Sequence, residues 1–169
     1  MDVRAAEATE IDHLARVWYD AWRDAHARIV PAELARLRTL ESFRDRLQAA
    51  LPTIRVVGPS GFPVGFCIVK GDEVYQLYVS ARSRGSGVAS ALVADAEARI
   101  SESGVAIAWL SCAIGNERAA RFYEKRGWHR AGTMVSVLDT LEGTFPLEVW
   151  RYEKPLRQTR VRSDEASIP

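Results

Sequence analysis

The sequence predicts a single α/β domain with a mixed sheet and helices packed on it. An apolar, strand-like run over residues 74–79 is followed by a loop with two glycines and by a helical run that begins at Val88. The next apolar run, 105–112, is followed by another helical segment and then by two further strand-like segments. Strands and helices in this order are typical of an α/β sheet. Because 169 residues suffice for one hydrophobic core, we expect one domain over residues 1–155.

The N-terminal part of the chain is predicted to be mainly helical. Apolar residues recur at helical spacing over 10–25, on a face rich in aromatic side chains. Pro31 suits the first position of a short helix that includes residues 34–37. A further helical stripe over 43–51 ends at Pro52, because proline cannot continue a helix.

Three strands are expected next. Residues 54–57 and 64–70 are short apolar runs separated by the turn cluster 58–61. Residues 71–72 then form a tight turn into the third strand, 73–80, so the last two strands make a hairpin.

The C-terminal half adds two helices and three strands. The helical run 88–100 carries its apolar residues on one side, so it should pack on the sheet. The strand 105–112 is apolar on both faces and is therefore expected near the centre of the sheet. A helix over 117–126 follows, and residues 128–138 and 147–152 are the last two strands that the pattern predicts.

Composition and charge argue against nucleic-acid and membrane partners. Hydrophobic residues make up 47% and charged residues 27% of the chain, as in ordinary soluble domains, and the formal net charge is +1. The first residues lack the apolar core of a signal peptide, and no run of 18 apolar residues occurs. We therefore expect a cytoplasmic protein. Residues 156–169 are weakly apolar and are expected to form a disordered tail, and an RNA-associated role would rest on Arg157, Arg160 and Arg162 alone.

The cysteines and histidines give no sign of a metal site. Cys67 and Cys112 each lie in an apolar strand-like run, as expected for reduced thiols in a core. The histidines His13, His26 and His129 are scattered without the spacing of metal ligands. We expect no metal.

The loop 84–89, Arg-Gly-Ser-Gly-Val-Ala, is the best local candidate for a ligand site. Glycines allow a backbone with positive φ and a close approach of a ligand, and the free N–H groups of the following helix favour phosphate oxygens. The spacing does not fit a Walker loop, which ends in Gly-Lys-Ser/Thr, or a dinucleotide-binding fingerprint. Taken by itself, the loop is equally compatible with a tight connection between a strand and a helix.

Two motifs together resemble a known family. Residues 84–89 match the Arg/Gln-x-x-Gly-x-Gly/Ala motif of the GCN5-related N-acetyltransferases, the GNAT family. Residues 116–128, Asn-Glu-Arg-Ala-Ala-Arg-Phe-Tyr-Glu-Lys-Arg-Gly-Trp, are similar to the family's Asn-x-x-Ala-x-x-Phe-Tyr-x-x-x-Gly-Phe pattern and follow in the right order. The chain departs from the family at Ala81, where proline is frequent, and at Trp128, where phenylalanine is usual. The resemblance extends over nearly the whole chain.

The resemblance implies a GNAT-like fold whose mostly antiparallel sheet is splayed at the cofactor site, and acetyl-CoA as the acyl donor. Basic residues cluster around the two helix starts, and of these only Arg84 is assigned to the cofactor. The cofactor-binding residues that the resemblance implies are Leu77, Tyr78, Val79, Arg84, Gly85, Ser86, Gly87, Val88, Ala89, Ser90, Asn116, Ala119 and Phe122.

Acetyl transfer to an amine needs a base and an acid, and one candidate exists for each. An alkyl amine is almost fully protonated at pH 7, so a proton must be removed before attack, and Glu73 stands where the family often has a carboxylate. The alternative for Glu73 is a solvated charge beside a hairpin turn. Tyr123 matches the family's general acid, which protonates the leaving thiolate, and the alternative is that it belongs to the apolar side of its helix. Asn116 also has a structural explanation as a helix N-cap.

The acceptor is not fixed by the sequence. Aromatic residues could line its pocket, although a helix stripe with two tryptophans is more often part of a core; the candidates are Trp18, Trp22, His26, Tyr75 and Tyr78. No acidic run and no basic groove indicates the charge of the acceptor, which leaves a small-molecule or a peptide amine. A homodimer is compatible with the sequence. The alternative function is a catalytically silent acyl-CoA-binding sensor or interaction module.

Overall fold

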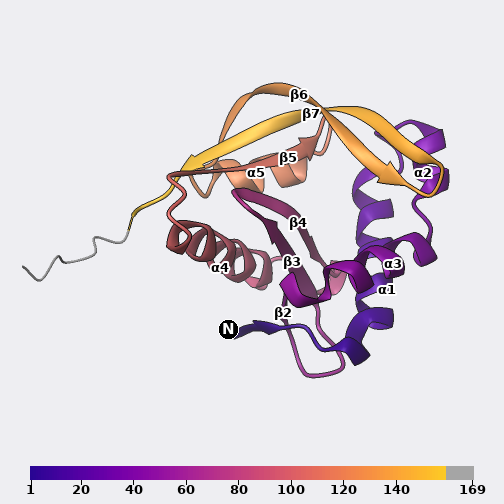
Figure 1. Cartoon of the computed structure of the whole chain (residues 1–169), viewed down its shortest axis with the longest axis horizontal. Helices are drawn as coiled ribbons and strands as arrows, with labels where there is room; N and C mark the ends of the chain where they lie inside the picture. Colours follow the sequence, from indigo (N-terminus) through magenta and orange to yellow (C-terminus); the bar gives the residue numbers. More distant parts are fainter. Residues whose placement is uncertain (159–169) are drawn as a thin grey trace, which may run out of the picture.

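The computed structural model describes residues 1–158, in which a seven-stranded sheet carries helices on both faces (Figure 1). In chain order the elements are β1 (Val3–Ala5), the 3₁₀ turn η1 (Ala8–Glu10), α1 (Ile11–His26), α2 (Ala32–Leu37), α3 (Leu40–Ala50), η2 (Leu51–Thr53), β2 (Ile54–Val57), β3 (Gly65–Lys70), β4 (Glu73–Val79), η3 (Ala81–Ser83), α4 (Val88–Glu102), β5 (Ile107–Ala113), α5 (Glu117–Glu124), β6 (His129–Thr140) and β7 (Gly143–Pro155).

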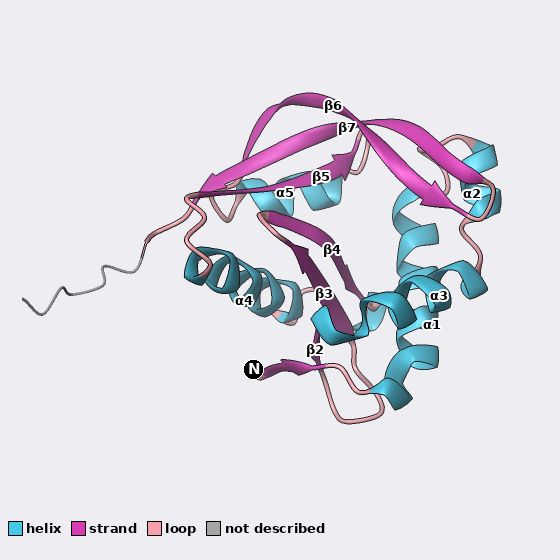
Figure 2. Ribbon diagram, in the orientation of Figure 1, coloured by secondary structure: helices cyan, strands magenta, loops and turns pink. Residues whose placement is uncertain are grey.

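The sheet is mixed and mostly antiparallel, as predicted. Its strand order is β1-β2-β3-β4-β5-β7-β6, and each neighbouring pair is antiparallel except β4 and β5. These two parallel strands are joined at one register pair, Glu73 with Trp109, at the start of β4. Beyond this pair the strands separate, so the sheet is splayed between the end of β4 and the end of β5 (Figure 2).

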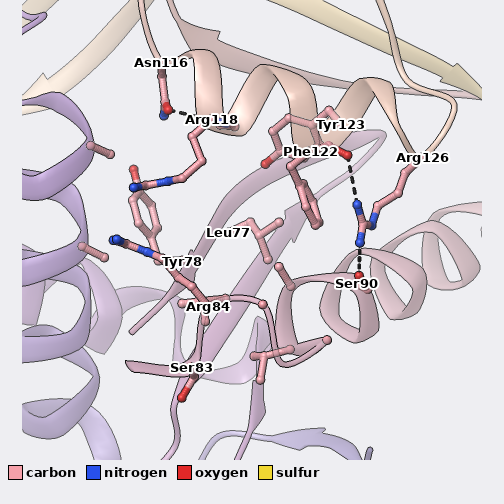
Figure 3. A pocket seen from close by; sticks show the side chains of 18 residues that line it. Leu77, Tyr78, Ser83, Arg84, Ser90, Asn116, Arg118, Phe122, Tyr123 and Arg126 are labelled. Carbon is pink, nitrogen blue, oxygen red and sulfur yellow. Dashed lines mark hydrogen bonds between the residues drawn. The ribbon is translucent and has the colours of Figure 1, made fainter. Parts of the chain in front are cut away.

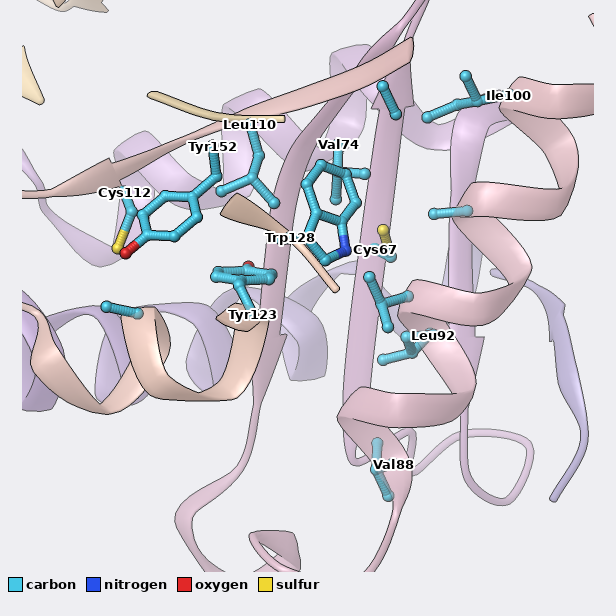
Figure 4. Close-up of a cluster of buried hydrophobic side chains, with 14 of the residues drawn as sticks. Cys67, Val74, Val88, Leu92, Ile100, Leu110, Cys112, Tyr123, Trp128 and Tyr152 are labelled. Atoms are coloured by element: carbon cyan, nitrogen blue, oxygen red, sulfur yellow. The ribbon is translucent and has the colours of Figure 1, made fainter. Parts of the chain in front are cut away.

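Two hydrophobic clusters lie on opposite faces of the sheet. One joins β3, β4 and β5 to α4 and α5, and Figure 4 shows Leu92 of α4 and Tyr123 of α5 among its members. The other joins α1 and α3 to β2 and β3 and includes Trp18 and Phe43. The helices therefore fix β4 from both sides while its C-terminal end stays unpaired with β5.

The two cysteines are buried free thiols, as expected. Cys67 lies on β3 and Cys112 on β5, and both belong to the cluster under α4 and α5. Burial raises the pKa of each thiol to about 12. Neither thiol is therefore ionised at neutral pH.

The structure differs from the sequence-based expectation at both ends of the chain. The edge strand β1 was not predicted, because three residues are too few to show an alternating pattern. The strand β7 runs from Gly143 to Pro155, well beyond 147–152, and forms a long hairpin with β6 at the edge of the sheet, where β7 pairs with β5 (Figure 1).

The ordered chain also continues past residue 155. The Leu156 amide donates to the Ala106 carbonyl at 2.8 Å, and the Arg157 carbonyl accepts from Ser101 at 2.7 Å. The beginning of the expected tail is thus held against α4 and the start of β5. The remainder, residues 159–169 with Arg160 and Arg162, lies outside the described residues.

Candidate functional site

A cleft of about 440 Å³ opens where β4 and β5 separate, between the start of α4, α5 and the end of β4 (Figure 3). The lining residues are Ala21, Ala25, Leu77, Tyr78, Val79, Ser83, Arg84, Gly85, Gly87, Val88, Ala89, Ser90, Asn116, Arg118, Ala119, Phe122, Tyr123 and Arg126. Every residue expected at the cofactor is in this set except Ser86, whose hydroxyl donates instead to the Ser83 carbonyl at 2.5 Å. The structure thus brings the two sequence motifs together on opposite walls of one cleft.

The glycine loop adopts the backbone that only glycine adopts easily. Gly85 has φ +75°, and Gly87, the N-cap of α4, has φ +90° and ψ 0°. A Cβ at Gly85 would meet no atom within 4 Å, and one at Gly87 would meet only Met1 Cε at 3.9 Å. The loop is therefore not shaped by crowding against other protein atoms, and open space remains beside the first turn of α4. The N–H groups of such a turn have no partner within their helix.

Three guanidinium groups line the cleft. Arg84 donates to Asp24 of α1 at 2.5 Å, and Arg118 donates to the same Asp24 oxygen at 3.4 Å. The hydrogen bond from Arg84 is the largest of the effects that lower the pKa of Asp24. Arg126 lies over the Phe122 ring at 3.8 Å, donates to the Phe122 carbonyl at 3.1 Å and contacts the Ser90 hydroxyl. Arg84 and Arg118 thus lie on the side of the cleft that faces α1, and Arg126 lies on the other side, beside α4 (Figure 3). Guanidinium groups on two sides suit a ligand that carries several negative charges.

Asn116 is the N-cap of α5, as the sequence predicts. Its Oδ1 accepts from the Ala119 amide at 3.3 Å, which satisfies one free N–H group of the first turn. Asn116 and Ala119 also line the cleft, so the cap lies at its wall.

Tyr123 lies deep in the cleft. Its side chain is 9% exposed, and Figure 3 shows it on the wall formed by α5. Within residues 1–158 its hydroxyl makes no hydrogen bond to another protein group, which leaves the O–H free for a ligand. Burial raises its pKa well above the usual value, so it is protonated at neutral pH.

Glu73 lies apart from the other predicted residues. It is at the start of β4, where that strand pairs with Trp109, and it does not line the cleft. The distance along the strand to Leu77 is roughly 13 Å. Burial raises the pKa of Glu73, while the charge of Lys70 opposes this shift.

The aromatic residues of α1 belong mainly to the core. Trp18 is 1% exposed and packs on Phe43 with ring centroids 4.6 Å apart, and Trp22 is also buried. Burial lowers the pKa of His26 to about 4, so it is neutral at pH 7. Tyr78 has its ring against Trp18 at 5.8 Å and reaches the cleft as well.

Sequence reasoning did not assign five of the lining residues to the site: Ala21, Ala25, Ser83, Arg118 and Arg126. Ala21 and Ala25 are one helical turn apart on α1. The same spacing occurs on any helix that packs in a core, so it does not indicate a ligand site. Arg118 and Arg126 lie within the second motif, at positions where the motif accepts any residue.

Comparison with known proteins decides the family. A family model described as the acetyltransferase (GNAT) family matches residues 14–128. The chain belongs to the GNAT family. The match spans both motifs and every residue that lines the cleft, so the GNAT assignment covers the whole candidate site.

Solved structures show the same GNAT fold. A GCN5-related N-acetyltransferase from Rhodopseudomonas palustris, also described as an aminotransferase of class II, is similar with a TM-score of 0.71 and 20% identity, over 92% of this chain and 95% of that chain. A PaiA N-acetyltransferase from Thermoplasma acidophilum, in complex with coenzyme A, has a TM-score of 0.68 and 17% identity, over 91% of this chain and 98% of that one. A ribosomal-protein-alanine N-acetyltransferase from Brucella melitensis has a TM-score of 0.69 and 19% identity, over 92% and 100% of the two chains. No curated protein matches the sequence.

Each helix in the described part of this GNAT protein is too short or too polar to cross a bilayer.

Proposed function

We propose that this protein transfers an acetyl group from acetyl-CoA to a primary amine of a small molecule or a peptide. The observation that carries the proposal is the cleft between β4 and β5, which combines a glycine loop at a helix N-terminus, three guanidinium groups and a buried tyrosine. GNAT membership supports the same donor. One protein of similar fold was solved as a coenzyme A complex.

In this proposal the loop 84–89 holds the pyrophosphate of acetyl-CoA. The positive end of the α4 dipole and its free N–H groups favour phosphate oxygens, and Arg84, Arg118 and Arg126 supply countercharge. The pantetheine arm then follows the gap between β4 and α5, beside Asn116. The thioester lies next to the unpaired end of β4 and to Tyr123.

The chemistry is a direct transfer. The amine nitrogen attacks the thioester carbonyl carbon and forms the new C–N bond, and a main-chain N–H of residues 77–79 stabilises the oxyanion. Collapse of this intermediate breaks the C–S bond, and Tyr123 gives its proton to the leaving sulfur. The amine loses a proton to Glu73. Since Glu73 is roughly 13 Å along β4 from Leu77, this transfer requires intervening water.

A thiol-release assay with acetyl-CoA and a panel of amines and peptides tests the proposal. We expect the wild-type protein to release CoA, and Tyr123→Phe to lower kcat by about 10²-fold or more without weakening CoA binding. Phenylalanine keeps the ring of Tyr123, whose hydroxyl has no protein partner within residues 1–158, so the fold should be unaffected. The matched control is Tyr19→Phe, half-buried on α1 and outside the cleft lining, which should not change kcat.

The assay separates the proposal from a silent acyl-CoA sensor. Tight CoA binding with no thiol release from any acceptor would contradict an enzyme and favour the sensor. Turnover that is unchanged in Tyr123→Phe would move the acid role to another group.

A further inference from the structure

Three cations gather on the side of β4 opposite the α4–α5 cluster. Arg38 follows α2, Arg46 lies on α3, and Lys70 ends β3. Arg46 donates to the Tyr75 hydroxyl at 3.2 Å, and the Lys70 ammonium lies 3.6 Å from the centre of the Tyr75 ring. The three cations are far apart in the sequence, so they do not form a basic run that sequence analysis could detect.

Arg38 is the most unusual of the three because it is a buried charge. It is 3% exposed, and its guanidinium donates to the Asp139 main-chain carbonyl at 2.8 Å. Burial, followed by the nearby charge of Arg46, lowers its pKa to about 10. It stays a cation at neutral pH, and buried cations in proteins are normally paired with an anion.

No carboxylate within residues 1–158 forms an ion pair with any of these cations. Tyr75 adds a further donor, since its oxygen accepts from Arg46 and its own O–H remains to be given. Burial opposes ionisation of Tyr75, but the charges of Arg46 and Lys70 outweigh it and lower the pKa of this phenol. The Trp18 Nε1 donor, beneath Arg46, is buried and also lacks a partner among the described residues. The cluster thus consists of positive charges whose protein acceptors are a carbonyl and a hydroxyl, with no ion-paired carboxylate within residues 1–158.

The cluster adjoins the proposed reaction centre. Tyr75 is three residues before Tyr78 on β4, a separation of roughly 10 Å, and Tyr78 lines the cofactor cleft. The β6–β7 hairpin closes this side: its Asp139 carbonyl binds Arg38, and its Glu142 pairs with Arg36 of α2 at 3.2 Å (Figure 1). An anion beside Arg38 and Arg46 would therefore lie on the same face of β4 as Tyr78, which lines the cleft.

We propose that the acceptor amine carries a carboxylate, which binds Arg38 and Arg46 on the α1–α3 side of β4 and directs the amine toward the thioester. This inference rests on the proposed acetyl transfer and narrows its acceptor to amino acids and related amino carboxylates. A carboxylate accepts hydrogen bonds from two guanidinium groups and from a phenol, and it compensates the buried charge of Arg38.

Arg38 also borders a second hollow of about 380 Å³ on the outer surface, together with Arg16, Arg23 and Arg36. Arg46 does not line this hollow. A carboxylate bound from the outer side would therefore depend on Arg23, whereas one bound beside the reaction centre depends on Arg46. Arg23→Gln and Arg46→Gln therefore distinguish the two binding positions.

The test compares acceptors that differ only in charge. Straight-chain amino acids from glycine to 6-aminohexanoate are each assayed beside the corresponding primary amide, with acetyl-CoA as donor. We expect a carboxylate to exceed its amide in kcat/KM by about tenfold or more at the best chain length, because hydrogen bonds to charged groups are lost in the amide. Arg46→Gln should lower the ratio of kcat/KM for the acid to kcat/KM for the amide to about one. Arg46→Lys should restore part of the preference for the acid, and Arg23→Gln should leave it unchanged.

Two results would overturn the inference and leave the enzyme in place. One is equal kcat/KM for acid and amide at every chain length in a protein that acetylates amines. The other is a carboxylate preference that Arg23→Gln removes and Arg46→Gln does not. Absence of acetyl-CoA binding, measured separately by calorimetry, would overturn the proposed function itself and the inference with it.

Discussion

At the scale of single residues, the two candidate catalytic groups have different surroundings: Glu73 lies on β4 and Tyr123 on α5. Tyr123 is buried in the cleft and free of protein partners within residues 1–158, whereas Glu73 lies where β4 and β5 are still paired. Burial raises the pKa of both groups. For Tyr123, the proposed acid, this keeps the proton in place. For Glu73, the proposed base, it increases proton affinity while requiring a higher pH for ionisation.

The pH profile of Glu73→Gln tests the base. A base acts when it is deprotonated, so activity that depends on Glu73 rises with pH through its raised pKa and is lost below it. We expect Glu73→Gln to lower kcat by about 10²-fold near pH 7 and to remove this acidic limb. Tyr123 should add no alkaline limb below about pH 10, because its pKa is shifted upward.

The measurement is kcat against pH at saturating acceptor, for wild type, Glu73→Gln and the exposed control Glu102→Gln at the end of α4. An acidic limb that persists in Glu73→Gln would assign the base to another group or to solvent.

At the scale of elements, α1 is connected to the glycine loop and to α5 through one side chain. Asp24 forms ion pairs with Arg84 of the loop and with Arg118 of α5, and both guanidinium groups line the cleft. The carboxylate therefore occupies the two cations that the proposal gives to phosphate oxygens. A cofactor that binds there must compete with it.

Asp24→Asn should therefore strengthen CoA binding. Exposed ion pairs contribute about 0.2–1 kcal/mol each, so we expect the Kd for CoA to fall by about two- to fivefold and its dependence on salt to become steeper. Calorimetry at two salt concentrations measures both effects. Asp20→Asn, one turn earlier on the same helix, is the control. Weaker binding in Asp24→Asn would mean that the carboxylate positions the arginines instead of competing for them.

At the scale of the whole molecule, the parts that the sequence predicts are those with local causes. The left-handed backbone at position 87 favours glycine, and the N-cap position at 116 favours asparagine. Both preferences are local, so both residues can be recognised in the sequence. The order of strands and helices follows from hydrophobic periodicity in the same way.

The parts that the sequence does not predict depend on contacts between distant elements. Arg38 is buried because the β6–β7 hairpin supplies the Asp139 carbonyl, 101 positions later. Asp24 meets Arg84 and Arg118 only after α1 has packed on β3 and β4. The strand β1 and the full length of β7 exist through pairing with other strands and have weak patterns of their own. The family motifs are therefore visible in the sequence at the proposed acetyl-CoA site, whereas the proposed acceptor site can be located only in the folded chain.

The most direct test of the central claim, that the cleft between β4 and β5 binds CoA, uses the two ends of α4. Gly87 and Gly104 have nearly the same backbone, φ +90° and +88°, and a Cβ at either position meets open space or a single distant atom. Valine at either position should therefore cause similar strain, of about 1–2 kcal/mol, but only Gly87 lines the cleft. Calorimetric titration with CoA should show a Kd raised by at least about tenfold in Gly87→Val, because contacts to charged phosphate oxygens are lost, and an unchanged Kd in Gly104→Val. Equal, wild-type-like CoA binding by the two variants would contradict the account.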